Sequence, residues 1–301
     1  MIAKIKAFFA KNVSHLAEVS IGHALISEAI YKGLQPTIEA YLSKLGYGMI
    51  LHSQIIGTGT PFVILHGFLG MSDNWKSLGK KFANQGYQMH LIDQRNHGRS
   101  FHDPVFSYQA MAADLLSYCE HHNLDQVVLL GHSMGGKTAM EFATAHPERV
   151  SKLVIADIAP RQYAEHHQDI LKGLGLLDFS IINSRAKADE VLARYIKEPG
   201  VRLFLLKNVY WIEKKQLALR VNLPVVTKEI AQVGKALATT AVFNKETLFV
   251  RGENSGYISS LDEISIQKHF PKSQIKTILG AGHWLHAENP QQFHQIVVDF
   301  L

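Results

Sequence analysis

The sequence predicts an α/β fold, a mostly parallel twisted sheet with helices on both faces. Three observations predict it. From residue 50 onward, short apolar segments alternate with segments of helical periodicity. The apolar segment 127–130 passes through a turn with glycine at each end straight into a helix-forming segment. Between residues 160 and 245 helical patterns follow one another without a convincing strand, which predicts a helical cap inserted into the sheet domain.

The elements follow from apolar runs and helix-start signals. We expect the cap to enter after the sixth strand of the fold, between core segments 49–159 and 246–301. Three polar side chains suit the position just before a helix, where they can accept hydrogen bonds from its first N–H groups: Ser72, Ser107 and Asn289. The strands that the apolar runs predict lie at residues 49–57, 61–65, 88–93, 127–130, 152–157, 247–251 and 274–279.

The first 48 residues have a different pattern. Their apolar side chains recur at helical spacing, and Pro36 divides two expected helices. Met49 opens a segment that suits the first strand of a complete domain. We therefore expect residues 1–48 to form a helical extension, which is an appended arm, a fusion, or translation from a misplaced start upstream of Met49.

Composition argues against a nucleic-acid-binding protein and against a membrane-spanning one. The chain has 301 residues, of which 47% are hydrophobic and 19% charged, so it can bury one large core. The net charge of +5 comes from scattered Lys and Arg residues, which is typical of a solvated surface and not of a nucleic-acid-binding face. No run of about 18 apolar residues predicts a membrane span, and no secretory signal is recognisable. We expect a cytoplasmic protein without stable membrane insertion.

The number and spacing of the cysteine and histidine residues do not predict a metal site. Cys119 is the single cysteine, so neither an intrachain disulfide nor a cysteine metal cluster can form, and we expect an inert core thiol. The pairs His121-His122 and His166-His167 are adjacent in sequence, so on a helix their side chains point in different directions. We expect no metal ion and no organic cofactor.

The turn Gly131-His132-Ser133-Met134-Gly135 matches the pattern G-x-S-x-G. Between a buried strand and a helix, such a turn holds a serine hydroxyl exposed at the carboxyl end of a parallel sheet, where it can attack a carbonyl. Glycine is needed at both ends because a side chain would crowd the neighbouring strand or helix. Ser133 is therefore the candidate nucleophile.

A serine nucleophile needs a histidine base and donors for the oxyanion. His283 lies in the loop after the last expected strand, on the edge where Ser133 should emerge, and His286 is the alternative. The backbone N–H of Met134, directly after the nucleophile, and that of Phe68, in a glycine-containing loop after another strand, are the candidate oxyanion donors.

From Ile50 to Leu301 the chain resembles the α/β-hydrolase superfamily, and in detail it is similar to the small bacterial YbfF-type esterases and their mitochondrial abhydrolase relatives. The resemblance implies an α/β-hydrolase fold and ester-hydrolysing activity. In this setting the segment from Arg95 to Ser100 is expected to brace the site and not to react. The matching segments are His66–Gly70, Asp93–Ser100, Gly131–Lys137, Asp157–Pro160 and Gly282–Glu288.

The acid departs from the common pattern of this superfamily. Most members place it in a G-x-x-D turn after the strand that follows the cap, and here that turn ends in Ser255. In the YbfF-type branch the resemblance implies that the carboxylate lies at the end of the preceding strand, which here is Asp157. Glu253 is the alternative acid. Ser255 can then hydrogen-bond to the acid or to the histidine, or it is simply a turn residue.

Together these features predict a serine hydrolase that cleaves small-molecule carboxylic esters, or thioesters, through an acyl-enzyme on Ser133. Large apolar residues in the cap suit a pocket for a short to medium acyl chain, although a self-packed cap has the same composition. The alternatives are a lyase or C–C hydrolase on the same fold and a ligand-binding relative without catalysis. The physiological substrate and the oligomeric state stay open.

Overall fold

The computed structural model describes residues 49–165, 167–214 and 216–301. The chain divides into two compact units, Met1–Ile50 and Leu51–Leu301. The expected helical extension, residues 1–48, lies outside the described residues, and so does His166. The second unit contains both the sheet and the cap.

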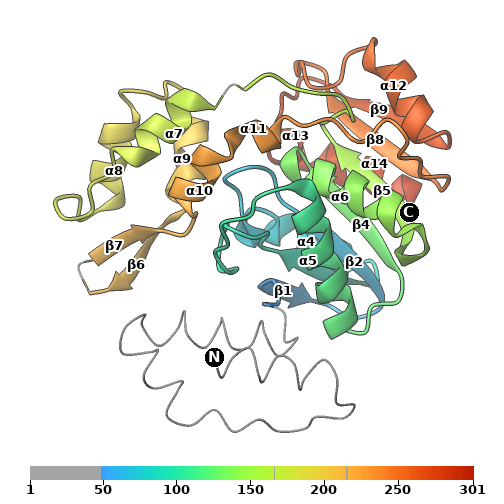
Figure 1. Cartoon of the computed structure of the whole chain (residues 1–301), viewed down its shortest axis with the longest axis horizontal. Helices are drawn as coiled ribbons and strands as arrows, with labels where there is room; N and C mark the ends of the chain where they lie inside the picture. Colours follow the sequence, from blue (N-terminus) through green and yellow to red (C-terminus); the bar gives the residue numbers. More distant parts are fainter. Residues whose placement is uncertain (1–48, 166, 215) are drawn as a thin grey trace, which may run out of the picture. The chain divides into compact units, whose positions relative to one another are not determined.

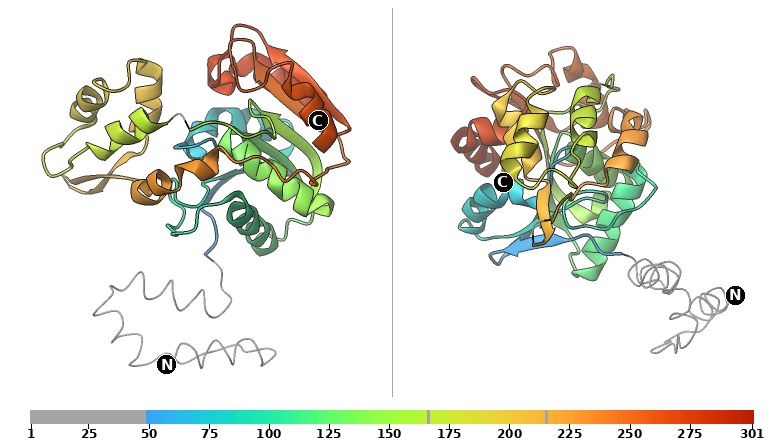
Figure 2. Two further views of the ribbon diagram at one scale, coloured as in Figure 1. Left: turned by 45° about the horizontal axis from the view of Figure 1, so that its top comes forward. Right: turned by 90° about the vertical axis from the view of Figure 1, so that its left-hand side faces the viewer.

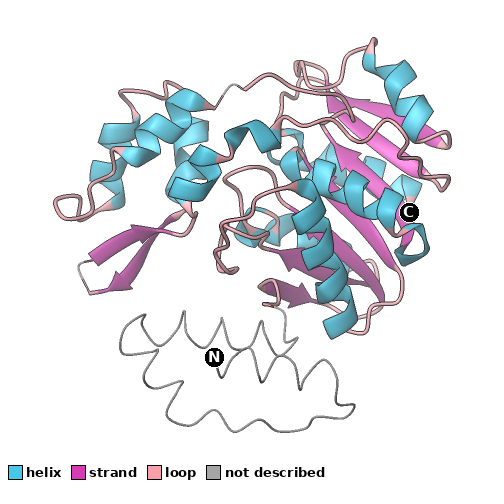
Figure 3. Cartoon of the chain, in the orientation of Figure 1, coloured by secondary structure: helices cyan, strands magenta, loops and turns pink. Residues whose placement is uncertain are grey.

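A seven-stranded sheet forms the centre of this second unit (Figures 1 and 3), with the strand order β1-β3-β2-β4-β5-β8-β9. Only the edge strand β1 runs antiparallel to its neighbour, and all other pairs are parallel. The prediction of a mostly parallel α/β-hydrolase sheet is confirmed. The strands are β1 (Ser53–Ile56), β2 (Thr60–Leu65), β3 (Tyr87–Ile92), β4 (Val127–His132), β5 (Val150–Ala156), β8 (Thr247–Gly252) and β9 (Ser273–Ile278).

Helices cover both faces of the sheet, which explains why its central strands are continuously apolar. On one face, side chains of α4 and α14, such as Phe82 and Phe293, join Ile64 and Leu130 in a single buried cluster. The helices α5 and α6 pack against each other and lie in front of the sheet in Figure 1. The core helices are α4 (Lys76–Ala83), α5 (Tyr108–His121), α6 (Met134–Ala145), α12 (Asp262–His269), α13 (Leu285–Glu288) and α14 (Pro290–Phe300), with 3-10 turns η1 (Ser72–Asn74) and η2 (Pro147–Arg149).

All six residues of β4 are buried. Burying one large aliphatic side chain contributes about 1.5–3 kcal/mol, so a strand of this kind is among the most stable parts of the unit. The nucleophile candidate Ser133 follows β4 directly. The nucleophile candidate is therefore attached to a fully buried strand.

Two of the three expected helix caps are confirmed. The Ser107 hydroxyl accepts a hydrogen bond from Ala110 N at 3.2 Å, and the Asn289 side chain accepts one from Gln292 N at 3.2 Å. Ser72 does not cap a helix, and that prediction is wrong. Its N–H donates to the buried carboxylate of Asp93 at 2.6 Å, which holds it in the turn η1, so the helix α4 begins only at Lys76.

The insertion between β5 and β8 forms a lobe beside the sheet (Figure 2). Among the described residues, five strands, β1 to β5, precede it and not the expected six, because a single strand, β1, lies before β2. The lobe comprises α7 (Gln168–Gly175), α8 (Arg185–Leu192), α9 (Pro199–Leu206), β6 (Val209–Glu213), β7 (Gln216–Leu219), α10 (Leu223–Lys228) and α11 (Ile230–Val233).

The sequence predicted a wholly helical cap, and that prediction is wrong. The cap also contains an antiparallel hairpin, formed by β6 and β7. The first strand follows the apolar helix α9 after a short break at Lys207 and Asn208. Its first four residues are all large and apolar, so neither alternation nor a glycine or proline marked the change from helix to strand.

Candidate active site

Ser133 occupies a sharp turn between β4 and α6, with φ 54° and ψ −119°, values that residues other than glycine rarely adopt. The flanking glycines make this turn possible. A Cβ atom on Gly131 would lie 2.2 Å from the carbonyl oxygen of Gly135, and one on Gly135 would lie 2.4 Å from that of Leu65. The strained turn places the hydroxyl at the carboxyl end of the parallel strands.

The structure brings Ser133, His283 and Asp157 into one hydrogen-bonded chain. The Ser133 hydroxyl lies 3.0 Å from His283 Nε2, and His283 Nδ1 lies 2.8 Å from Asp157 Oδ2. Asp157 is fully buried after β5, also at positive φ (52°), and its second oxygen accepts a hydrogen bond from Gly252 N at 3.1 Å. The geometry suits proton transfer from the serine to a histidine that the carboxylate orients.

Ser255 and Glu253, the two other residues considered around the catalytic acid, have different hydrogen-bond partners. The Ser255 hydroxyl donates to Asp157 Oδ2, the same oxygen that faces His283. The carboxylate of Glu253, the alternative acid, instead accepts a hydrogen bond from Gly280 N at 2.7 Å and is exposed. The structure therefore places Asp157, and not Glu253, against the histidine.

The loop that carries Phe68 runs along the serine turn. A Cβ atom on Gly67 would lie 3.3 Å from Ser133 Cβ, so the two backbones are in close approach. His66 holds the loop, because its Nδ1–H donates to Gly67 O at 2.8 Å and its Nε2 accepts from Gln94 N at 3.0 Å. Met134 begins α6, so its N–H is one of the free donors at the helix start.

Two residues that touch the histidine were not found from the sequence. His132 Nε2–H donates to the backbone carbonyl of His283 at 2.8 Å, and burial holds the pKa of His132 well below its usual value, so this imidazole is neutral. The ring of Tyr257 stacks on the ring of His283, with centroids 3.8 Å apart and 16° between the planes. Neither position stands out in the sequence, because both contacts join segments far apart in the chain.

The segment from Arg95 to Ser100 braces the site, as expected, and Asp93 takes part in it. The Asp93 carboxylate accepts hydrogen bonds from the backbone N–H groups of Ser72 and Arg99, at 2.6 and 2.8 Å. The Arg95 guanidinium forms a two-point contact with Asp114, at 2.5 and 2.7 Å. None of these bonds involves Ser133 or His283, so the segment holds loops together and leaves the reacting side chains to other elements.

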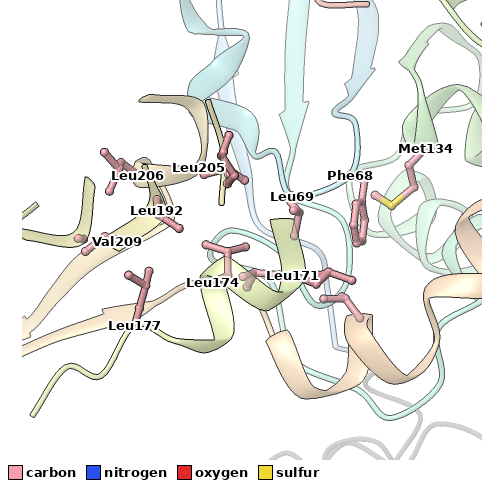
Figure 4. Close-up of a cluster of buried hydrophobic side chains, with 14 of the residues drawn as sticks. Phe68, Leu69, Met134, Leu171, Leu174, Leu177, Leu192, Leu205, Leu206 and Val209 are labelled. Carbon is pink, nitrogen blue, oxygen red and sulfur yellow. The ribbon is translucent and has the colours of Figure 1, made fainter. Parts of the chain in front are cut away.

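An apolar cavity of about 260 Å³ opens beside Ser133. The core contributes Phe68 and Trp75, and the cap contributes Ile170, Val201 and Phe204. Figure 4 shows how core and cap meet, with Leu69 among leucines of the cap and Phe68 near Met134. The cavity is therefore walled by both parts of the unit and adjoins the nucleophile.

His286 and Cys119 have structural surroundings. His286, the alternative base, stacks on Trp75 with centroids 4.1 Å apart, and burial lowers its pKa to about 3. The Ser133 hydroxyl contacts His283 instead. Cys119 is a buried free thiol whose pKa burial raises to about 12, which confirms an inert core cysteine.

No group of three or more His, Cys, Asp and Glu side chains within the described ranges is arranged to hold a metal ion. Among the same residues, no helix combines the length and the apolar character that a membrane crossing requires.

Comparison with known proteins places this geometry in a family. Residues 60–193 match the model of the alpha/beta hydrolase fold. The sn-1-specific diacylglycerol lipase ABHD11 of Danio rerio is 35% identical over 252 residues, which are 81% of this chain and 79% of that protein. The chain belongs to the α/β-hydrolase family.

Other members of this family are similarly close. Esterase YbfF of Escherichia coli is 34% identical over 232 residues, 77% of this chain and 89% of that protein. The solved structure of a marine microorganism esterase superposes with a TM-score of 0.82 at 39% identity, covering 84% of this chain and all of that one. The expected resemblance to YbfF-type esterases is confirmed.

The amino-terminal segment matches something else. Residues 2–46 match the model of the pyridoxal phosphate biosynthesis protein PdxJ, whereas the α/β-hydrolase match begins at residue 60.

Proposed function

We propose that the protein hydrolyses carboxylic esters of short to medium acyl chains through an acyl-enzyme on Ser133. The observation that carries this proposal is the hydrogen-bonded chain from Ser133 through His283 to Asp157, beside an apolar cavity. The named relatives, an esterase and a diacylglycerol lipase, support ester hydrolysis as the reaction.

In the proposed reaction, the same residues act first in acylation of Ser133 and then in hydrolysis of the acyl-enzyme. His283 Nε2 accepts the proton of the Ser133 hydroxyl while the oxygen attacks the ester carbonyl. The oxyanion accepts hydrogen bonds from the N–H groups of Phe68 and Met134, and His283 returns the proton to the departing alcohol. A water molecule then repeats the sequence on the acyl-enzyme, which releases the acid and restores Ser133.

Asp157 and Ser255 have supporting roles in this scheme. The Asp157 carboxylate fixes the tautomer with hydrogen on Nδ1 and stabilises the imidazolium that forms during attack. Ser255 donates to the carboxylate oxygen that faces the histidine, so it holds that oxygen in place. Glu253 points to the Gly280 N–H and has no part in the reaction.

The cavity supports the acyl preference. Its side-chain lining is largely apolar, and its volume of about 260 Å³ suits a chain of several methylene groups. Each buried methylene contributes about 0.8 kcal/mol, so affinity should increase with chain length until the cavity is filled.

Hydrolysis of p-nitrophenyl esters of increasing acyl length, measured beside a panel of acyl-CoA thioesters, tests the proposal. We expect kcat/KM to pass through a maximum at a medium chain and a fluorophosphonate probe to label wild type but not Ser133→Ala. Absence of labelling together with absence of ester turnover contradicts the proposal and favours the ligand-binding alternative. Labelling without turnover of any ester or thioester favours the lyase or C–C hydrolase alternative.

We propose further that residues 49–301 carry this activity without residues 1–48. The separate family matches and the division of the chain near residue 50 support this. Expression of residues 49–301 should give a product with unchanged kcat/KM, whereas an insoluble or inactive product would make the first segment part of the enzyme. A cytoplasmic location stays a prediction from the sequence.

A further inference from the structure

The cap joins the core through two connecting segments, residues 158–163 and 233–237, which we call the neck. The segments are hydrogen-bonded to each other, because Tyr163 N donates to Gly234 O and Leu237 N donates to Pro160 O, both at 2.8 Å. They are also tightly packed, since a Cβ atom on Gly234 would lie 2.3 Å from the carbonyl oxygen of Tyr163. The neck is thus one attachment of the cap to the core, beside contacts such as the hydrogen bond from Asn208 Nδ2 to Leu69 O at 2.8 Å.

Lys137 of α6 lies beneath this neck. It is 2% exposed, and its ammonium donates to Arg161 O at 2.5 Å and to Lys235 O at 2.8 Å, one carbonyl from each segment. Its own backbone N–H donates to Ser133 O at 3.1 Å, one helical turn away. A single side chain therefore connects the helix that starts at the nucleophile with both ends of the cap.

The surroundings of Lys137 explain why a lysine can be buried there. Burial lowers its pKa to about 7, the charge of Arg161 lowers it as well, and Asp262 raises it. Arg161 is itself paired with Asp262 at 2.7 Å, and the Lys137 nitrogen lies 5.1 Å from the ring centre of Tyr163. A neutral amine keeps two N–H donors, so both carbonyls can be satisfied in either protonation state.

The neck also touches the catalytic histidine through two tyrosines. The Tyr163 hydroxyl accepts from Ala159 N at 2.8 Å and donates to Tyr257 O at 2.5 Å. Tyr257 in turn stacks on His283 and lines the acyl cavity. A displacement of the neck would therefore change both the cavity wall and the support of the histidine ring.

We infer that Lys137 is a positioning residue, which fixes both segments of the neck to the nucleophile's helix and thereby sets the acyl cavity that the cap completes. The inference rests on the proposed function for its kinetic consequence. Its structural consequence is independent of that function. Replacement of Lys137 should loosen the two segments together, because both lose a hydrogen bond to the same nitrogen.

Lys152 offers a matched control. Its ammonium also donates to two main-chain oxygens, the carbonyl of Phe300 at 2.6 Å and the terminal carboxylate of Leu301 at 3.0 Å, but these lie at the carboxyl end of the chain, far in sequence from the neck. Lys137→Met and Lys152→Met each remove one amino group and two hydrogen bonds to main-chain oxygens, and Lys152→Met also removes an ion pair with Glu246 at 3.5 Å. Only the first should affect the cap.

Hydrogen exchange of the full chain, without substrate, measures the structural consequence. We expect peptides covering both neck segments to exchange at least tenfold faster in Lys137→Met and at the wild-type rate in Lys152→Met. For the kinetic consequence, we expect KM for a p-nitrophenyl ester of medium acyl length to increase about tenfold in Lys137→Met. We expect kcat for the acetyl ester to fall by a smaller factor, about threefold, because the neck also supports the ring of His283 through Tyr257.

Gly234→Ala serves as a second variant, because it forces the neck segments apart without touching the lysine. It should reproduce the faster exchange and the higher KM, and it keeps the inference testable if Lys137→Met does not fold. Unchanged exchange in the neck, or equal changes in Lys137→Met and Lys152→Met, would overturn the inference. If wild type hydrolyses no ester, the proposed function fails, while the exchange measurements still decide the role of Lys137.

Discussion

The strand-end site and the cap are positioned in different ways. Ser133 and Asp157 follow the neighbouring parallel strands β4 and β5, whose last residues, His132 and Ala156, pair in register. The backbone holds Ser133 and Asp157 at positive φ. The cap instead contacts the core through the neck and through packed apolar side chains such as Leu69 and Leu205. The comparison indicates that the reaction depends on the sheet, whereas the choice of acyl group depends on side chains of the cap.

Removing the nucleophile should give the largest effect. We expect Ser133→Ala to lower kcat for every ester by at least about 10³-fold, because members of such a hydrogen-bonded unit fail together. Ser151→Ala is the matched control, since Ser151 donates to Val127 O at the opposite end of the same pair of strands. Initial rates on a short-chain and a medium-chain ester measure both. A selective loss on the longer ester alone would contradict the division between sheet and cap.

Replacing the catalytic acid should give the second-largest effect. Asp157→Asn should lower kcat about 10³-fold, because an amide cannot stabilise the imidazolium and can favour the wrong tautomer. Glu253→Gln should stay within about threefold of wild type, because the glutamine oxygen can still accept from Gly280 N. Steady-state kinetics of the two purified variants decide the assignment, and the reverse order of effects would move the acid to Glu253.

Substitutions in the cap should change the selectivity for acyl length and leave the rate of the chemical step unchanged. Phe204 lines the cavity, so Phe204→Ala should increase KM for a medium-chain ester about tenfold, the loss expected from an apolar contact of about 1.4 kcal/mol, and leave the acetyl ester nearly unchanged. Leu203 is the neighbouring residue of α9 and is 66% exposed, so Leu203→Ala is the control. An equal loss on both esters in Phe204→Ala would show that the cap also positions the reacting groups.

The smallest effect is expected at Ser255. Ser255→Ala removes one hydrogen bond to the Asp157 carboxylate, whose second oxygen still accepts from Gly252 N. We expect kcat to fall about fivefold, the equivalent of a hydrogen bond of about 1 kcal/mol, at every acyl length. Ser259→Ala, which alters a hydroxyl bonded to Asp262, is the control. A loss as large as that of Asp157→Asn would make Ser255 indispensable to the acid.

Much of the site could be predicted because its signals are local. The turn around Ser133 needs glycine at positions 131 and 135 for steric reasons that act within a few residues, so the pattern predicts the geometry. The strand β4 is buried throughout, and its first four residues are apolar because both of its faces are covered. The caps at Ser107 and Asn289 are likewise local, whereas the wrong cap at Ser72 results from a distant carboxylate, Asp93.

Other features had no local signal. The stacking of Tyr257 on His283 and the bond from His132 to the His283 carbonyl join residues that are distant in sequence. The position of Asp157 was implied by resemblance, since a carboxylate after a strand is common and only the order of the strands in the sheet tells which histidine it can reach. The hairpin of the cap was missed because its first strand continues an apolar run.

The sequence by itself determined the α/β alternation, the strained serine turn and the set of side chains available for acyl transfer, because backbone sterics and apolar periodicity act over a few residues. Tertiary structure decided which carboxylate faces the histidine, which rings hold that histidine, and how Lys137 meets both ends of the cap. Those arrangements result from the order of strands in the sheet and from packing between distant segments, and no short stretch of sequence specifies either.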